Sequence, residues 1–193
     1  MEGRSSVVSC YSYDVLLGFV LASLLLGDVP SEVEPFVEQG TTVLAIERAD
    51  LNRDHREDVV LVLEPNDPEL PRTLLLLVRD AKGALQLAKR SAKAVFCRNC
   101  GGVMGDPFQG VHVEKGRFTI EHYGGSSWRW SANYTFAWSR RDRSWQLVRV
   151  ESSSFHASEP DKIETTIEIP PKDFGLIDVT DFDPEDYLGK GKK

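Results

Sequence analysis

A short polar loop carries the residues of this sequence that are best suited to binding an ion. Within nine residues, oxygen atoms fall at positions 1, 3, 5, 7 and 9: the side chains of Asp50, Asn52, Asp54 and Asp58, and the backbone carbonyl of Arg56 at position 7. Calcium takes about six to eight oxygen ligands, and the loops that wrap around it space their ligands in this way. The spacing predicts a candidate calcium site formed by these five residues.

The same loop departs from a calcium loop in three respects. Position 6, where glycine normally supplies a positive φ, is His55, and position 12, where a glutamate would bind the ion through both oxygens, is Leu61. Arg53 and Arg56 add positive charge beside the carboxylates. The alternative is a metal-free loop that Asp and Asn side chains close by hydrogen bonds to its own amides, with histidine tolerating the positive φ.

Two cysteines form a second motif, Cys97-x-x-Cys100. A zinc site would need a second pair of ligands at suitable spacing, which the sequence does not contain. A thioredoxin-like pair would begin a helix, whereas Gly101 and Gly102 follow here. We predict a disulfide that stiffens a glycine-rich loop, provided that the protein is exported. In the cytosol both side chains would be reduced thiols.

The third candidate site is the segment Trp128, Arg129 and Trp130, for which we predict a role in partner binding. Aromatic rings next to an arginine can stack on a sugar or on a protein surface. The alternative is structural, because aromatic and polar residues alternate throughout residues 127–139, as they do in a half-buried strand.

Catalytic groups are not assembled by any motif. The histidines are scattered: His55, His112, His122 and His156. No Gly-x-Ser-x-Gly motif surrounds a serine. Acids that could hydrolyse a glycosidic bond are Asp54, Asp58, Glu121 and Glu151. Because no spacing places two of them across a cleft, we predict that the protein is not an enzyme; the alternative is a secreted or periplasmic hydrolase acting on polysaccharide or peptide.

The elements that would position these residues are β-strands. Aliphatic or alternating segments predict strands at residues 42–47, 59–63, 72–79, 84–89, 111–114, 117–123, 127–139 and 144–151. The unbroken aliphatic run at 59–63 predicts a strand that is buried on both faces. Short turns such as Lys115-Gly116 predict antiparallel hairpins. We expect a mainly β fold of about eight to ten strands, either an antiparallel β-sandwich or a partly closed barrel.

The order of these motifs resembles a known kind of protein. The loop that starts at Asp50 and runs into an aliphatic strand is similar to a single FG-GAP or integrin-like repeat loop. Residues 34–155 resemble uncharacterised secreted bacterial proteins in which a Cys-x-x-Cys-Gly-Gly segment, here 97–102, and a Tyr-Gly-Gly-Ser strand, here 123–130, follow such a loop. The resemblance implies a location and a fold class more than an activity. Because the motif occurs once, no propeller of repeated blades is expected.

Size, charge and the amino terminus set further bounds. A chain of 193 residues with a net charge of −7 suits one domain and does not suit nucleic-acid binding. The apolar run at 15–27 has the length of a signal-peptide hydrophobic region and is too short for a membrane span, so we expect no stable membrane insertion; the alternative is a buried amphipathic helix. We divide the chain into a signal sequence or helix at 1–30, a β-rich domain at 31–170 and an acidic tail with a basic end at 171–193.

These observations together predict an exported, non-enzymatic β-domain that binds a protein or glycan partner. Its location would be extracytoplasmic, either periplasmic or secreted, with a cytoplasmic location as the alternative. Calcium is the candidate cofactor. The sequence does not indicate an oligomeric state.

Overall fold

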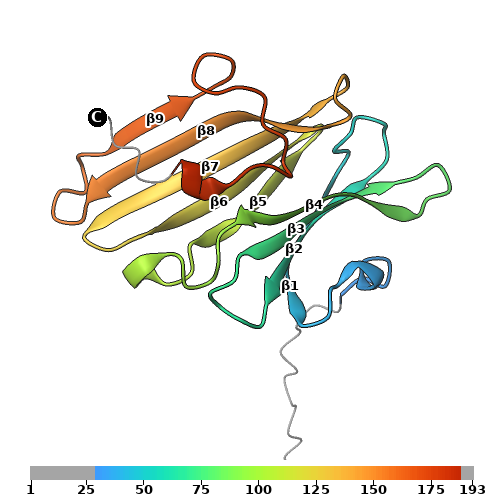
Figure 1. The fold of residues 1–193 in the computed structure, drawn as a ribbon, viewed down its shortest axis with the longest axis horizontal. Coiled ribbons are helices and arrows are strands. Elements are labelled where there is room, and N and C mark those ends of the chain that lie inside the picture. Colours follow the sequence, from blue (N-terminus) through green and yellow to red (C-terminus); the bar gives the residue numbers. More distant parts are fainter. Residues whose placement is uncertain (1–28, 188–193) are drawn as a thin grey trace, which may run out of the picture.

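Two antiparallel meanders make up residues 29–187, the part of the chain that the computed structural model describes (Figure 1). The first sheet contains, in order, β1 (Thr41–Ala49), β2 (Asp58–Pro65), β3 (Arg72–Arg79) and β4 (Leu85–Val95). The second contains β5 (Phe108–Glu114), β6 (Arg117–Gly125), β7 (Trp128–Ser139), β8 (Ser144–His156) and β9 (Glu164–Glu168). Three short 3-10 helices are described as well: η1 (Glu34–Phe36) precedes β1, η2 (Gly102–Met104) lies between β4 and β5 in the chain, and η3 (Pro184–Asp186) follows β9.

The predicted mainly β fold is confirmed as a sandwich, and the two described sheets do not join into a closed barrel. Each of the eight predicted segments corresponds to a described strand, and only residues 84 and 127 fall just outside one. β9 was not predicted, because its residues 164–167 are exposed and show no buried face. β4 and β8 also extend further than predicted, to Val95 and His156.

The core lies between the sheets. Val60, Leu74 and Leu76 of the first sheet belong to the same buried cluster as Tyr134 and Phe136 of β7. The predicted alternation of β7 is confirmed, since Ala132, Tyr134 and Phe136 are buried while the residues between them are only partly covered. The acidic segment that follows residue 170 also enters this cluster, with Val179 and Phe182 fully buried.

The outer face of the first sheet is covered by residues 29–40, which we call the strap. Val33 of the strap is buried in a second apolar cluster with Leu61 of β2 and Leu75 of β3. The strap is fixed by ion pairs, for example Glu32 to Arg48 (2.6 Å) and to Arg79 (2.9 Å). This cover explains why residues 59–63 are buried on both faces, as predicted.

Predictions that concern the two ends of the chain lie outside the described residues. These are the signal sequence or helix, apart from residues 29 and 30, and the last six residues, which include the whole basic end. Between residues 29 and 187, no helix is long and apolar enough to cross a membrane.

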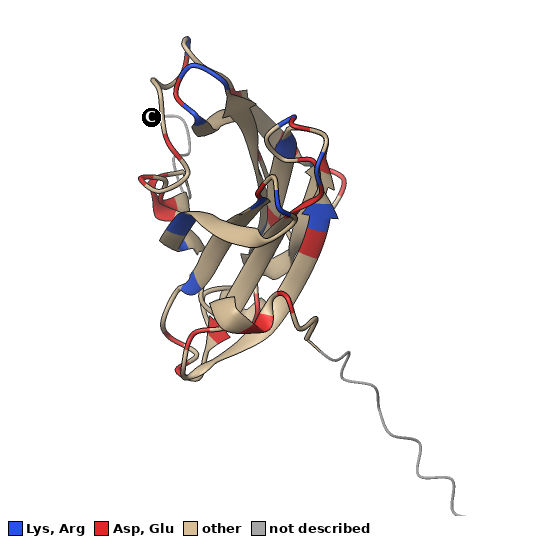
Figure 2. Cartoon of the chain, turned by 90° about the vertical axis from the view of Figure 1, so that its right-hand side faces the viewer, with Lys and Arg blue, Asp and Glu red and all other residues tan. Residues whose placement is uncertain are grey.

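The loops gather at the two ends of the sandwich. At one end the β1–β2 loop, which contains Asp50, contacts the β5–β6 turn, because the amide of Gly116 donates to the carbonyl of Asp50 (2.8 Å). Figure 2 looks onto that side of the molecule, where basic and acidic residues are mixed on the loops. At the other end the loop of residues 97–106 meets the β6–β7 turn, since the amide of Gly125 donates to the carbonyl of Gly101 (2.8 Å).

Candidate functional site

The Asp50 loop closes on its own backbone. The carboxylate of Asp50 accepts hydrogen bonds from the amides of Asp54 (2.9 Å) and His55 (3.2 Å). The side-chain oxygen of Asn52 accepts from the amide of Asp54 (2.9 Å), and Asp54 in turn accepts from the amide of Arg56 (2.9 Å). His55 has a φ of 68°, the conformation that position 6 of such a loop requires.

Asp58 joins the loop to the sheet. It is fully buried, and its two oxygens accept hydrogen bonds from the amides of Leu51 (3.0 Å) and Arg79 (2.9 Å). Burial raises the pKa of Asp58 despite these two bonds. At Asp50 burial also acts to raise the pKa, but the bonds from Lys115 (3.3 Å) and from the loop amides hold the pKa below its ordinary value.

This arrangement does not offer calcium a prepared site. The carboxylates are engaged by backbone amides, and Asp54 and Asp50 are paired with the cations Arg56 and Lys115. Within the described residues, no group of three or more His, Cys, Asp or Glu side chains is placed to hold a metal ion. The calcium site therefore stays a prediction from the sequence alone.

We expect the melting temperature to be the same in millimolar calcium as in a chelator, because an ion would have to displace existing hydrogen bonds and two positive charges. Thermal melting followed by circular dichroism checks this. A melting temperature that rises with calcium concentration, as binding to the folded state requires, would establish the site instead.

The loop of residues 97–106, which we call the disulfide loop, is the second candidate. The predicted bond between Cys97 and Cys100 is present, with the two Cα atoms 5.1 Å apart. The two cysteines differ in environment, since Cys97 is only 2% exposed while Cys100 is exposed. No helix of the thioredoxin type follows; the chain makes the single turn of η2.

Close contacts between glycines anchor this loop to the β6–β7 turn. The amide of Gly101 donates to the carbonyl of Gly105 (2.9 Å), and a Cβ at Gly101 would lie 2.2 Å from that same oxygen. At Gly124 a Cβ would lie 2.7 Å from the Trp130 ring and 3.0 Å from the carbonyl oxygen of Gly101, which also accepts the hydrogen bond of the Gly125 amide. The Cys-x-x-Cys-Gly-Gly and Tyr-Gly-Gly-Ser segments, which lie more than 20 residues apart in the sequence, therefore pack against each other. Side chains would prevent this approach.

Arg72 holds the far end of the disulfide loop. Its guanidinium is fully buried and binds both oxygens of Asp106 (2.8 and 2.6 Å), together with Glu64 (2.9 Å) and the carbonyl of Phe96 (3.3 Å). Burial acts to raise the pKa of Asp106, but Arg72 and the amide of Phe108 hold the pKa below its usual range. Sequence reasoning missed this group; the signal was an arginine at the start of an aliphatic strand.

His122 lies beside this ion pair and is 1% exposed. Its Nε2 accepts a hydrogen bond from the amide of Phe96 (3.4 Å), and the rings of Phe96, Phe108 and Tyr134 surround it. Burial, with a further contribution from Arg72, lowers the pKa of His122 to about 3. The imidazole is thus neutral and serves the core.

Three large apolar side chains are exposed where the disulfide loop meets the β6–β7 turn. They are Val103 (82% exposed), Met104 (43%) and Trp128 (64%), and we call them the apolar tip. The backbone links them, because Gly102 packs on Gly125 and a Cβ at Gly125 would lie 2.1 Å from the carbonyl oxygen of Trp128. The ring of Trp128 makes an edge contact with His156 (5.2 Å between centroids).

The three residues predicted to bind a partner do not form one surface. Trp128 lies at the exposed start of β7, whereas Trp130 is only partly exposed and packs against Phe96 (5.8 Å between ring centroids). Arg129 points to the opposite face of β7, as the period of a strand requires. Only Trp128 of the three is freely available to a partner.

The acids of the hydrolase alternative are not brought together as a group. Glu121 and Glu151 are both register partners of Asn133, on either side of β7, and Glu151 is paired with Arg149 (2.6 Å). Asp54 and Asp58 belong to the Asp50 loop. No pair of these acids lines the pocket described next.

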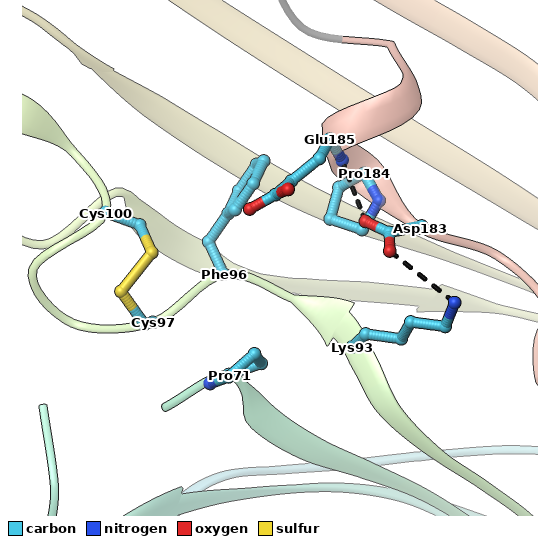
Figure 3. A pocket seen from close by; sticks show the side chains of 8 residues that line it. All are labelled: Pro71, Lys93, Phe96, Cys97, Cys100, Asp183, Pro184 and Glu185. Carbon is cyan, nitrogen blue, oxygen red and sulfur yellow. Dashed lines mark hydrogen bonds and ion pairs between the residues drawn. A yellow bond between two sulfur atoms is a disulfide. The ribbon is translucent and has the colours of Figure 1, made fainter. Parts of the chain in front are cut away.

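A pocket of about 270 Å³ lies beside the disulfide (Figure 3). Its walls come from the start of β3, the end of β4, the disulfide loop, and η3 with the residue before it. The lining residues are Pro71, Lys93, Phe96, Cys97, Cys100, Asp183, Pro184 and Glu185. Lys93 reaches across to Asp183 (3.5 Å). The pocket therefore combines an apolar floor with a mixed charged rim, and the disulfide forms part of its wall.

Comparisons with known proteins add little to this geometry. No protein-family model and no curated protein matches the sequence. A solved structure described as "Structure of a Xanthomonas Type IV Secretion System related protein" is similar over 69% of this chain and 56% of that chain, with a TM-score of 0.43 and 16% identity. This chain thus matches little more than half the length of that protein. A likeness of this extent says nothing about what either protein binds, so the function of the chain is inferred from its own site.

Proposed function

We propose that this chain is an exported β-domain without catalytic activity, and that it binds a protein partner through the apolar tip. The observation that carries the proposal is the exposure of Val103 and Met104 on the disulfide loop and of Trp128 at the adjoining start of β7. The disulfide and the buried Arg72 hold this loop in place. Exposed apolar clusters on soluble domains mark interaction sites, and tryptophan is enriched among the residues that dominate binding energy.

The supports of the tip favour a binding role over a structural one. The disulfide, the glycine contacts and the pair between Arg72 and Asp106 all restrain the loop before any partner arrives. A loop held in its bound conformation loses little entropy on binding, which increases affinity. Aliphatic Val103 and flexible Met104 suit a protein surface better than a sugar, which polar groups and stacked rings recognise.

Export is supported by the disulfide between Cys97 and Cys100. Disulfides persist in oxidising compartments, whereas cytosolic thiols are kept reduced. The cytoplasmic alternative would leave the disulfide loop without this covalent restraint.

A position-specific cross-linking experiment tests the binding role. A photoreactive amino acid placed at Val103 should capture a partner that the same amino acid at Leu176, which is 65% exposed on the C-terminal segment, does not capture. The captured protein, identified and purified, should bind a Val103→Ser, Trp128→Ser double variant at least about 30-fold more weakly than the natural chain. The Leu176→Ser variant should bind normally.

Two results would contradict the proposal. One is equal cross-linking at positions 103 and 176. The other is an affinity for the purified partner that the tip substitutions leave unchanged. Binding to a glycan in place of a protein would also be evident, since the tip variants would then lose retention on a glycan array.

A further inference from the structure

The disulfide differs from a purely structural one in where its two sulfurs lie. Cys97 follows the buried Phe96 and is covered, whereas Cys100 is exposed, and both line the pocket shown in Figure 3. The pocket has room for several water molecules, because each occupies about 30 Å³. A small thiol can therefore reach the bond from the side of Cys100.

We propose that Cys100 is a thiol-exchange site, at which a small dithiol reduces the bond to Cys97 and so releases the disulfide loop. Exchange would then control how rigidly the apolar tip is presented. This second part rests on the binding role proposed above, while the exchange itself does not.

The chemistry takes two steps. One thiolate of the dithiol attacks Sγ of Cys100, a sulfur–sulfur bond forms between them, and the bond to Cys97 breaks with Cys97 leaving as a thiolate that takes a proton from water. The second thiolate of the dithiol then attacks its own partner sulfur in the mixed disulfide and expels Cys100 as a thiolate, which is also protonated. The dithiol is oxidised to a cyclic disulfide, and the two electrons reduce the cysteine pair.

Exposure decides which cysteine is attacked. An attacking thiolate must approach the sulfur on the side away from the bond that breaks, and access is among the factors that set the rate. Both cysteines line the pocket, but Cys97 is only 2% exposed and belongs to the buried core, so little of it is accessible to a thiolate. Cys100 is exposed to solvent, so an attacking thiolate has more access to its sulfur.

Reduction acts directly on the base of the tip. Gly101 follows Cys100 directly in the chain and makes hydrogen bonds with Gly105 and with Gly125. When the disulfide opens, the backbone next to these two hydrogen bonds is no longer restrained by a covalent cross-link. A four-residue disulfide ring restrains the open chain modestly, so we expect amide exchange at Gly101 and Gly125 to become about tenfold faster or more. The centre of β2, for example Leu61, should be unaffected.

Thiol reactivity tests the site itself. In a Cys10→Ser background, Cys97→Ser leaves Cys100 as the single thiol and Cys100→Ser leaves Cys97. In the folded proteins, dithionitrobenzoate should react with Cys100 at least about tenfold faster than with Cys97. In denaturant the two rates should be equal, which serves as the control. Equal rates in the folded proteins, or a faster Cys97, would overturn the assignment.

Hydrogen exchange of the Cys10→Ser chain, with and without dithiothreitol, tests the release of the loop and needs no cysteine substitution in the disulfide. Faster exchange at Gly101 and Gly125 with dithiothreitol supports the proposal, and unchanged exchange in a chain shown by mass to be reduced contradicts it. The Cys97→Ser, Cys100→Ser double variant should show no response to dithiothreitol. Neither experiment involves a partner, so failure of the binding role cannot be mistaken for failure of this one.

Discussion

Replacement of Arg72 by alanine is expected to lower the free energy of unfolding by about 3 to 5 kcal/mol, because it removes a fully buried guanidinium and leaves the largely buried Glu64 without its cation. Arg72 is fully buried and binds Asp106 through two hydrogen bonds, with Glu64 on its other side. Alanine would also leave a cavity, since Arg72 is among the largest fully buried side chains. Urea unfolding followed by tryptophan fluorescence measures the change.

Two further substitutions make this prediction specific. Arg72→Lys should fail to restore stability, because an ammonium cannot reproduce the two parallel bonds to Asp106. Arg90 also pairs with both oxygens of a carboxylate, that of Glu38, but on the surface, so Arg90→Ala should cost less than about 1 kcal/mol. Equal effects of Arg72→Ala and Arg90→Ala would show that burial of the pair is not what matters.

Stability is expected to fall steeply with acid because of His122. The pKa of this residue is about 3 in the folded state and about 6.5 in the unfolded chain, so the unfolded chain binds a proton that the folded one does not. The contribution of neutral His122 to the free energy of unfolding is therefore complete above pH 6.5 and is lost as the pH falls from 6.5 to about 3. The loss is about 1.4 kcal/mol for each pH unit, or about 5 kcal/mol in all.

The comparison with His122→Gln isolates this contribution from that of the carboxylates, which titrate over part of the same range. Glutamine does not titrate, and its side-chain oxygen can still accept the bond from the Phe96 amide. The free energy of unfolding of the variant, measured by urea unfolding at a series of pH values, should therefore depend less on pH between 6.5 and 5. Parallel curves for the two proteins would mean that His122 takes up its proton equally in the folded and the unfolded state, which would contradict the prediction.

Arg72 and His122 belong to one support behind the disulfide loop. Arg72 binds Asp106 at the end of the loop, and His122 accepts from Phe96, which precedes Cys97. Both groups therefore have a structural task. The buried histidine would otherwise look like a candidate base, but its imidazole is enclosed by aromatic rings.

Local patterns in the chain were enough to predict eight of the nine described strands and the short-range features. The alternation at residues 127–139 reports burial of one face directly, because side chains in a strand point to opposite sides in turn. The bond between Cys97 and Cys100 and the positive φ of His55 involve residues close together in the sequence, so their spacing carries the information.

Contacts between distant segments leave no pattern in the sequence of either segment. The meeting of Gly101 with Gly125, the cover of Leu61 by the strap and the pair between Arg72 and Asp106 each depend on how the sheets and loops pack in space. The candidate site shows the same division. The sequence suggested that Trp128, Arg129 and Trp130 act together. In the structure Arg129 points to the other face of β7, and the partly buried Trp130 packs against Phe96. Spacing along a chain specifies what lies within one element, whereas the approach of separate elements depends on the packing of side chains that no single segment contains.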